Sequence, residues 1–175
     1  RAVGAIDELA GRTRRVAAFA ARLVAPLGFG LTALVWLHAV TPLAVLPPER
    51  DPTAQMRGWG PFAADVEALR REVGAGWIAV PSYTLAGQFA LRLGTERVVQ
   101  LDEPARYAHL PPPDAAMLAE PALFVTRARK DLMVRFRDRF DTIERLGTRD
   151  RMVRGEVVDT YAIYRLSGPR GVPRR

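Results

Sequence analysis

The chain has 175 residues, 49% of them hydrophobic and 26% charged, and it carries a formal net charge of +7. Its mean hydropathy of −0.04 is ordinary for a globular protein, but such an average can conceal an apolar segment inside a charged chain. The chain has no cysteine, which excludes disulfide scaffolds and thiolate metal sites.

Residues 1–22 mix charged side chains with small apolar ones. Position 1 is Arg rather than Met, and an acidic pair, Asp7 and Glu8, precedes the first long apolar run. A signal peptide begins near a native start and has a shorter apolar centre, of roughly 7–15 residues. We therefore expect a piece of a longer protein, with a signal anchor as the alternative.

Residues 23–48 contain no charged side chain and predict a transmembrane helix. Its central residues, 27–46, would span roughly 30 Å at about 1.5 Å per residue, which is the thickness of the hydrocarbon layer of a bilayer. Pro42 lies near the far end, where a kink disturbs the helix least. The alternative is a buried helix of a soluble core, but a core helix rarely runs this long without a polar face.

Positive charge is concentrated on the amino-terminal side of this apolar segment. Residues 12–22 hold four Arg, whereas on the other side Arg50 and Arg57 are offset by Glu49 and Asp51. Lys and Arg close to a membrane helix favour the cytoplasmic side. We therefore expect a cytoplasmic juxtamembrane segment at residues 1–22 and a domain outside the cytoplasm after the helix.

Residues 49–166 are numerous enough for one small domain with its own core. A proline-rich link opens it, and Asp51 and Thr53 can cap the turn that follows. The next segment, residues 58–73, predicts an amphipathic helix, because apolar residues recur there at spacings of four, three and four. These residues are Phe62, Val66, Leu69 and Val73.

Residues 77–101 predict a strand–helix–strand unit. The continuous apolar run 77–80 predicts a buried strand, residues 84–93 a helix, and residues 98–101 a second strand. Such a unit favours a parallel pair of strands.

The remainder of the chain predicts a late hairpin after an irregular segment at 102–121. We expect a third strand at 122–126 and a short charged helix at 127–137 with Leu132, Met133 and Phe136 facing inward. Two final strands, 140–146 and 156–166, would flank a polar turn at 149–155. The end of the chain, 167–175, predicts disorder. The fold class is therefore α/β, with one transmembrane helix followed by a small three-layer-like domain whose mixed, partly parallel sheet has about five strands.

The sequence provides no catalytic or metal-ligating constellation. His38 and His109 lie far apart, and no glycine-rich phosphate loop follows a predicted strand. Tyr83 and Gln88 follow the first strand and Asp102 follows the second, at the edge where open α/β sheets bind ligands. They are the candidate substrate-binding residues, although a packed tyrosine, a solvated glutamine and a loop cap are the simpler interpretation.

Basic residues are also dense between positions 127 and 139. A run of this kind can bind phosphate or nucleic acid. Asp131 and Asp138 are interleaved with the basic residues, and this pattern is typical of a solvated surface. We therefore expect no nucleic-acid partner.

Three stretches of the chain resemble a known family. They are the run from Asp51-Pro52-Thr53 to Gly58-Trp59, the helix Tyr83-x-x-Ala86-x-x-Phe89-Ala90, and the strand Tyr161-x-x-Tyr164-Arg165-Leu166. Together with the preceding apolar helix, they resemble the C-terminal region of bacterial membrane glycosyltransferases of the dolichyl-phosphate-mannose protein mannosyltransferase type, the family-39 group that includes the aminoarabinose transferases. The resemblance covers about residues 23–166.

The chain also departs from that family. Leu91-Arg92 stands where similar sequences often have an aromatic pair, and Ser82 stands where they have a basic residue. Both departures fall at or near the edge that carries Tyr83, so they weaken the inference of a ligand there.

The resemblance implies a multi-pass enzyme of the cell inner membrane that transfers a sugar from a polyprenyl-phosphate carrier to a periplasmic acceptor. Its catalytic acids, and any divalent metal, would lie upstream, so this piece would hold no cofactor and would be inactive alone. Its partners would be membrane lipid and, through the whole protein, the lipid-linked sugar. The alternatives are a single-pass anchored periplasmic module that binds or scaffolds a partner and, third, a basic module facing the cytoplasm.

Overall fold

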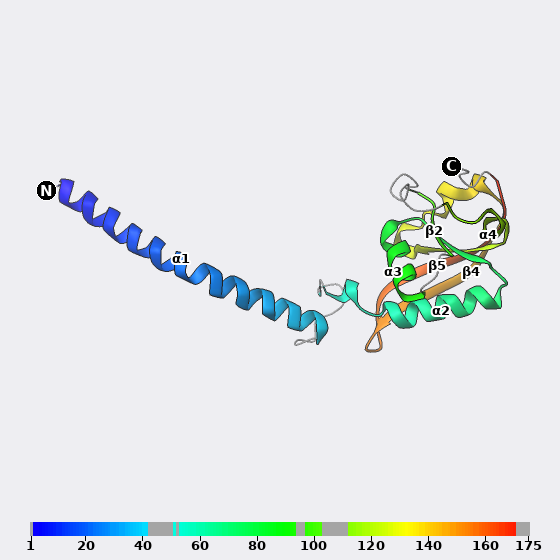
Figure 1. Ribbon diagram of the computed structural model, residues 1–175, viewed down its shortest axis with the longest axis horizontal. Helices are drawn as coiled ribbons and strands as arrows, with labels where there is room; N and C mark the ends of the chain where they lie inside the picture. Colours follow the sequence, from blue (N-terminus) through cyan, green and yellow to red (C-terminus); the bar gives the residue numbers. More distant parts are fainter. Residues whose placement is uncertain (1, 42–50, 52, 94–96, 103–111, 171–175) are drawn as a thin grey trace. The chain divides into compact units, whose positions relative to one another are not determined.

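The computed structural model describes residues 2–41, 51, 53–93, 97–102 and 112–170, with side chains from residue 17 onward (Figure 1). The chain divides into two compact units, Arg1–Pro47 and Pro48–Arg175. The first unit contains the helix α1, and the second contains a five-stranded sheet with its covering helices.

Helix α1 (Ala2–Val40) is 39 residues long and includes the charged amino-terminal segment. Its part Ala17–Val40 is long and apolar enough to cross a membrane, spanning about 36 Å at about 1.5 Å per residue. The helix ends at Val40, whereas the expected transmembrane helix ran from residue 23 to residue 48. It ends there because the residue before a proline, here Thr41, disfavours helical backbone. The rest of the predicted span, residues 42–48, lies outside the described residues.

The sheet has the order β2-β1-β3-β5-β4. Strand β1 (Trp77–Val80) pairs in parallel with β2 (Val98–Gln100) and β3 (Ala122–Arg127). Strand β5 (Glu156–Pro169) is antiparallel to both β3 and β4 (Phe140–Val153). The predicted mixed sheet of about five strands is confirmed.

The helices form layers on both faces of this sheet. Helices α2 (Trp59–Glu72) and α3 (Tyr83–Leu93) cover one face, and their buried side chains pack on Ile78 and Val80 of β1. The alternate residues of that strand, Trp77 and Ala79, point to the other face, because successive strand residues face opposite ways.

The second face is covered by shorter elements. They are α4 (Ala115–Ala119) and the 3-10 helices η3 (Ala128–Lys130) and η4 (Met133–Arg139), which bring Met117, Met133 and Phe136 onto Phe124 of β3. The predicted three-layer arrangement is therefore confirmed. The predicted short helix at 127–137 instead consists of two 3-10 turns, with Met133 and Phe136 buried as expected.

Two predicted boundaries near the end of the chain are wrong. The polar turn expected at 149–155 is mostly strand, since β4 continues to Val153 and only Arg154 and Gly155 form the turn. Both have positive φ, 55° and 85°, as a tight two-residue hairpin turn requires. The predicted disordered tail begins too early, because residues 167–169 belong to β5 and pair with β4. Residues 171–175 lie outside the described residues.

Candidate functional site

The carboxyl ends of β1, β2 and β3 lie at one edge of the sheet because these strands run in parallel. The Leu101 amide donates a hydrogen bond of 2.9 Å to the Val80 carbonyl, so the ends of β1 and β2 are adjacent. Since β5 is antiparallel to β3, the start of β5 and the end of β4 lie at this same edge. We call it the carboxyl edge.

Of the three predicted binding residues, Tyr83 and Asp102 follow strands that end at this edge, whereas Gln88 lies midway along α3. Tyr83 is the first residue of α3 and is half exposed, and Gln88 follows it by five positions, about 140° around the helix. The Asp102 carboxylate accepts a hydrogen bond of 2.7 Å from Nη1 of Arg135, a residue of η4 on the opposite layer from α3. A common binding role for the three residues therefore stays a prediction.

A compact turn leads into the domain at the carboxyl edge. We define the link turn as Asp51 and residues 53–59, which include the 3-10 helix η1 (Ala54–Met56). Oδ1 of the buried Asp51 accepts hydrogen bonds from the amide of Thr53, at 2.8 Å, and from its hydroxyl, at 2.6 Å. The other carboxylate oxygen lies 3.2 Å from Nη1 of Arg57. Asp51 thus holds the start of the turn with its side chain, as predicted, whereas Thr53, the N-cap of η1, makes no side-chain cap hydrogen bond.

A fully buried arginine, Arg151 of β4, holds the link turn on the sheet. Its Nη1 donates to the carbonyls of Ala54, at 3.1 Å, and of Arg57, and its Nη2 donates to the side-chain oxygen of Gln55 at 3.3 Å. Its guanidinium also lies 4.4 Å from the ring centroid of Trp59. The same group therefore satisfies buried acceptors of the link turn and stacks on the first residue of α2.

The role of Arg151 was not predicted from the sequence, because residues 149–155 were assigned to a polar turn. A usable signal was present, since the predicted strand begins at Glu156, and a two-residue turn at Arg154-Gly155 would have extended the preceding strand through Arg151. An arginine within a paired strand is a candidate for burial with hydrogen-bonded partners.

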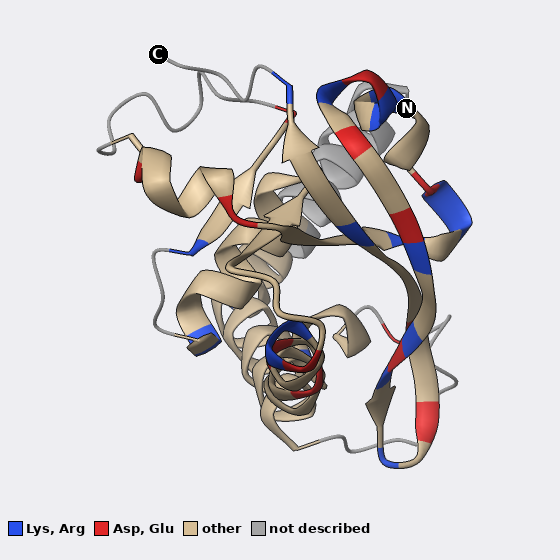
Figure 2. Ribbon diagram, turned by 90° about the vertical axis from the view of Figure 1, so that its right-hand side faces the viewer, with Lys and Arg blue, Asp and Glu red and all other residues tan. Residues whose placement is uncertain are grey.

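Charge on the rest of the domain is interleaved rather than gathered. Figure 2 shows basic and acidic segments following one another along the β4–β5 hairpin. Asp159 lies 3.0 Å from Nε of Arg127, and Arg149 lies 3.3 Å from Asp65. These pairs neutralise part of the basic surface. The Arg149–Asp65 pair is exposed and contributes little to stability, whereas the Asp159 carboxylate of the other pair is largely buried.

Tyr161, on β5, lies beside the buried arginine. Burial raises the pKa of its hydroxyl, and the nearby Asp159 carboxylate raises it further, whereas Arg151 and Arg127 oppose the shift. Burial likewise raises the pKa of Tyr164, whose hydroxyl donates to Asp131.

We expect the domain to lose stability as the pH rises above about 10, the ordinary pKa of tyrosine. With raised pKa values, the folded state holds protons that the unfolded state has already released, so alkali favours unfolding. Tyr161→Phe should make the decline with pH shallower, and the double variant with Tyr164→Phe shallower still. Urea midpoints from pulse proteolysis in detergent, measured between neutral and alkaline pH, test this. Parallel curves for all three proteins would contradict it.

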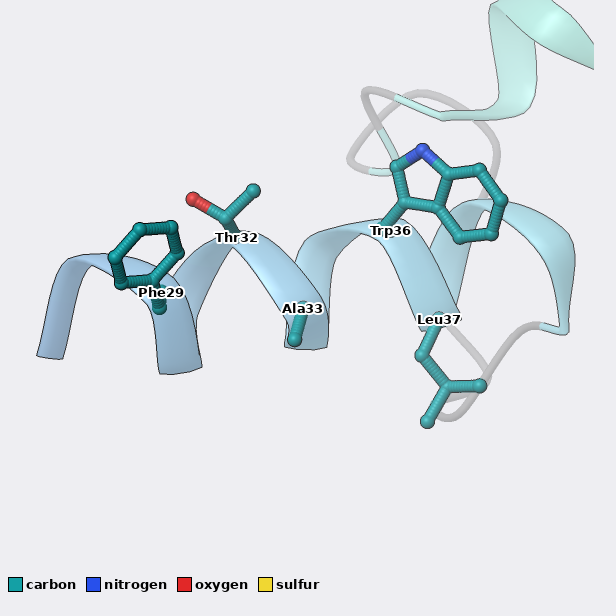
Figure 3. A pocket seen from close by; sticks show the side chains of 5 residues that line it. All are labelled: Phe29, Thr32, Ala33, Trp36 and Leu37. Atoms are coloured by element: carbon teal, nitrogen blue, oxygen red, sulfur yellow. The ribbon is translucent and has the colours of Figure 1, made fainter. Parts of the chain in front are cut away.

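The apolar part of α1 carries a second surface feature, a shallow hollow on one face of the helix (Figure 3). The residues that line it recur at helical spacings of three, one, three and one: Phe29, Thr32, Ala33, Trp36 and Leu37. The Thr32 hydroxyl donates to the Gly28 carbonyl at 2.8 Å, so its donor is satisfied within the helix.

No group of three or more His, Asp or Glu residues within the described ranges is placed to hold a metal ion. Among the described residues at the carboxyl edge, arginine, tyrosine and carboxylate side chains form hydrogen bonds and ion pairs with one another.

Comparisons of the chain with protein-family models, with curated proteins and with solved structures each found no match.

Proposed function

We propose that this chain is the C-terminal membrane helix and periplasmic cap domain of a multi-pass inner-membrane glycosyltransferase that uses a polyprenyl-phosphate-linked sugar. The observation that carries the proposal is the order of the parts. An exposed apolar helix of 24 residues, long enough to cross a membrane, is followed by a small α/β domain. In this proposal the sugar transfer takes place on residues upstream of this piece.

The link turn supports the proposal. The stretch from Asp51 to Trp59 carries the most specific part of the resemblance, and in the structure it is fixed by the contacts of Asp51 and Arg151. The most specific stretch of the resemblance is therefore an ordered part of the domain.

The hollow on α1 is consistent with the same proposal. Its residues form an exposed stripe with the spacing of a helix-packing face, and the small Thr32 and Ala33 within it would let a neighbouring backbone approach. In a multi-pass protein this stripe would pack on a neighbouring membrane helix. The domain would cover the active-site cavity and help select the acceptor, with Tyr83, Gln88 and Asp102 as the first residues to test.

The second candidate is a single-pass anchored module that binds or scaffolds a partner in the periplasm. It is favoured by one observation, the closed core of the domain, in which both faces of the sheet are already covered by its own helices. A domain with such a core can fold without further membrane helices.

The intact mass of the native polypeptide separates the two candidates. Membranes would be washed with high salt and with alkali, and the protein detected with an antibody to residues 49–175. We expect a membrane-retained species several times heavier than 19.3 kDa. A retained species near 19.3 kDa would contradict the transferase and leave the single-pass module.

A further inference from the structure

Two arginines at the carboxyl edge converge on a single carboxylate. Arg127 is the last residue of β3, and Arg129 belongs to η3. Their Nε atoms lie 3.0 Å and 3.8 Å, respectively, from the two carboxylate oxygens of Asp159 on β5. The hydroxyl of Tyr161 donates to the same carboxylate at 3.4 Å. We call these four residues the edge cluster.

The edge cluster has an excess of positive charge on its exposed side. The Asp159 side chain is only 8% exposed, whereas that of Arg127 is 34% exposed and that of Arg129 is 68% exposed. An anion that approaches from solvent therefore meets guanidinium groups before it meets the carboxylate.

A third guanidinium lies behind the cluster. Arg151 is fully buried beside Tyr161, and its hydrogen bonds go to neutral oxygens of the link turn. These bonds satisfy its donors without cancelling its charge. Three guanidinium groups thus accompany one carboxylate, which leaves an excess of two positive charges.

The edge cluster also lies at a topological switch point of the sheet. Strand β1 continues into α3 on the first face, whereas β3 continues into η3 and η4 on the second face. The chain therefore leaves the carboxyl ends of these two adjacent parallel strands in opposite directions. Open α/β sheets bind ligands at such a position. Arg127 closes β3 there, three residues beyond Phe124, the last residue of β3 that pairs with β1.

We propose that the edge cluster binds a phosphate group, with the guanidinium groups of Arg127 and Arg129 as the donors. A guanidinium presents paired N–H donors in a plane, and this arrangement matches two oxygens of a phosphate. The excess of two positive charges suits a phosphate monoester, which carries a charge of about −1.5 to −2 at neutral pH. A soluble molecule or a lipid can carry the phosphate. The proposal concerns the domain itself and does not depend on the transferase.

The later basic residues of the run 127–139 do not share this arrangement. Arg135 is matched by one carboxylate, that of Asp102, at 2.7 Å. Arg139 donates to the Leu101 carbonyl at 3.0 Å, on the second face of the sheet. The phosphate site is therefore confined to the first two arginines of the run.

The test uses the whole chain in an uncharged detergent and follows the phosphorus-31 line width of inorganic phosphate. Arg129→Gln should raise the dissociation constant about tenfold, because charge-assisted hydrogen bonds are the stronger ones. Arg129 is mostly exposed, so its replacement leaves the core intact. Arg92→Gln is the matched control, since Arg92 is an exposed arginine on the last turn of α3, towards the opposite edge of the sheet. This control should bind phosphate like the parent chain.

Competition identifies the molecule that carries the phosphate. Glycerol 3-phosphate in solution and phosphatidic acid in the micelles are added separately, with acetate at the same ionic strength as the control for charge alone. Stronger displacement of inorganic phosphate by glycerol 3-phosphate would support a soluble ligand. Stronger displacement by phosphatidic acid would support a lipid headgroup.

The absence of line broadening with the parent chain would overturn the proposal. Equal dissociation constants for Arg129→Gln and Arg92→Gln would also overturn it, because net charge alone would then account for the binding. Acetate that displaces phosphate as well as glycerol 3-phosphate does would overturn the preference for phosphate. None of these results changes the mass of the native polypeptide, so the proposed function is tested separately.

Discussion

Arg151→Ala is expected to lower the free energy of unfolding of the domain by about 3 kcal/mol, because buried acceptors left without donors cost about 1–3 kcal/mol each. The variant removes the hydrogen bonds to the Ala54 and Arg57 carbonyls and to Gln55, together with the stacking on Trp59. The Ala54 carbonyl keeps a hydrogen bond of 3.1 Å from the Arg57 amide, so the cost falls on the Arg57 carbonyl and the Gln55 side chain. Part of this loss is offset, since a buried guanidinium is itself costly to desolvate. The link turn should detach from the hairpin before the rest of the sheet opens.

Arg149→Ala is the matched control. Arg149 lies two residues earlier on the same strand and pairs with the exposed Asp65 at 3.3 Å. Exposed pairs contribute about 0–1 kcal/mol, so this variant should unfold close to the parent protein. Urea midpoints from pulse proteolysis measure both. Hydrogen exchange at residues 53–59 shows whether the link turn has loosened. Equal midpoints for Arg151→Ala and Arg149→Ala would refute the role of Arg151.

Arg151→Lys tests whether the positive charge of Arg151 or the geometry of its donors holds the link turn. Lysine keeps the positive charge but replaces the planar fork of donors by a single ammonium, so it cannot reach two carbonyls and an amide at once. Its midpoint should lie closer to that of Arg151→Ala than to the parent. A fully stable lysine variant would mean that the charge alone holds the turn.

The elements that were predicted correctly are those with a strong local pattern. The stripe of Phe62, Val66 and Leu69 marks one buried face of α2, and the continuous run 77–80 is buried on both faces because helices cover both sides of β1. The hairpin turn and the 3-10 segments were misjudged because their signals are weak. Arg154 is not a usual turn residue, and 3-10 helices of three and seven residues have too few positions to show a clear period.

The candidate site was harder to predict because its contacts are distant in sequence. Arg151 meets Ala54 across 97 positions, and nothing near either residue indicates the other. The parallel strands predicted that Tyr83 and Asp102 follow strand ends at one edge of the sheet. The ion pair between Asp102 and Arg135 could not be predicted, because it depends on how η4 crosses the opposite face. Local patterns predict the strands, whereas packing decides which polar side chains meet.

Gly58→Ala is expected to destabilise the domain by about 3 kcal/mol, the sum of a left-handed backbone cost of about 1–2 kcal/mol and a steric clash. Gly58 precedes α2 with a φ of 73°, and a Cβ there would lie 2.5 Å from the Met152 carbonyl oxygen. That atom is backbone of β4, so the hairpin itself would have to move, and the hydrogen bonds of Arg151 to the link turn would lengthen with it.

Two other glycines separate these contributions. Gly74 also has positive φ, 64°, but a Cβ would have open space, so Gly74→Ala should cost only the backbone part, about 1–2 kcal/mol. Gly60 lies inside α2 with open space, and Gly60→Ala should stabilise by up to about 1 kcal/mol, since alanine favours helix. Urea midpoints should rank Gly60→Ala above the parent, then Gly74→Ala, then Gly58→Ala. If Gly58→Ala matched Gly74→Ala, the close approach of the hairpin to the link turn would contribute nothing, and the junction would depend on Arg151 alone.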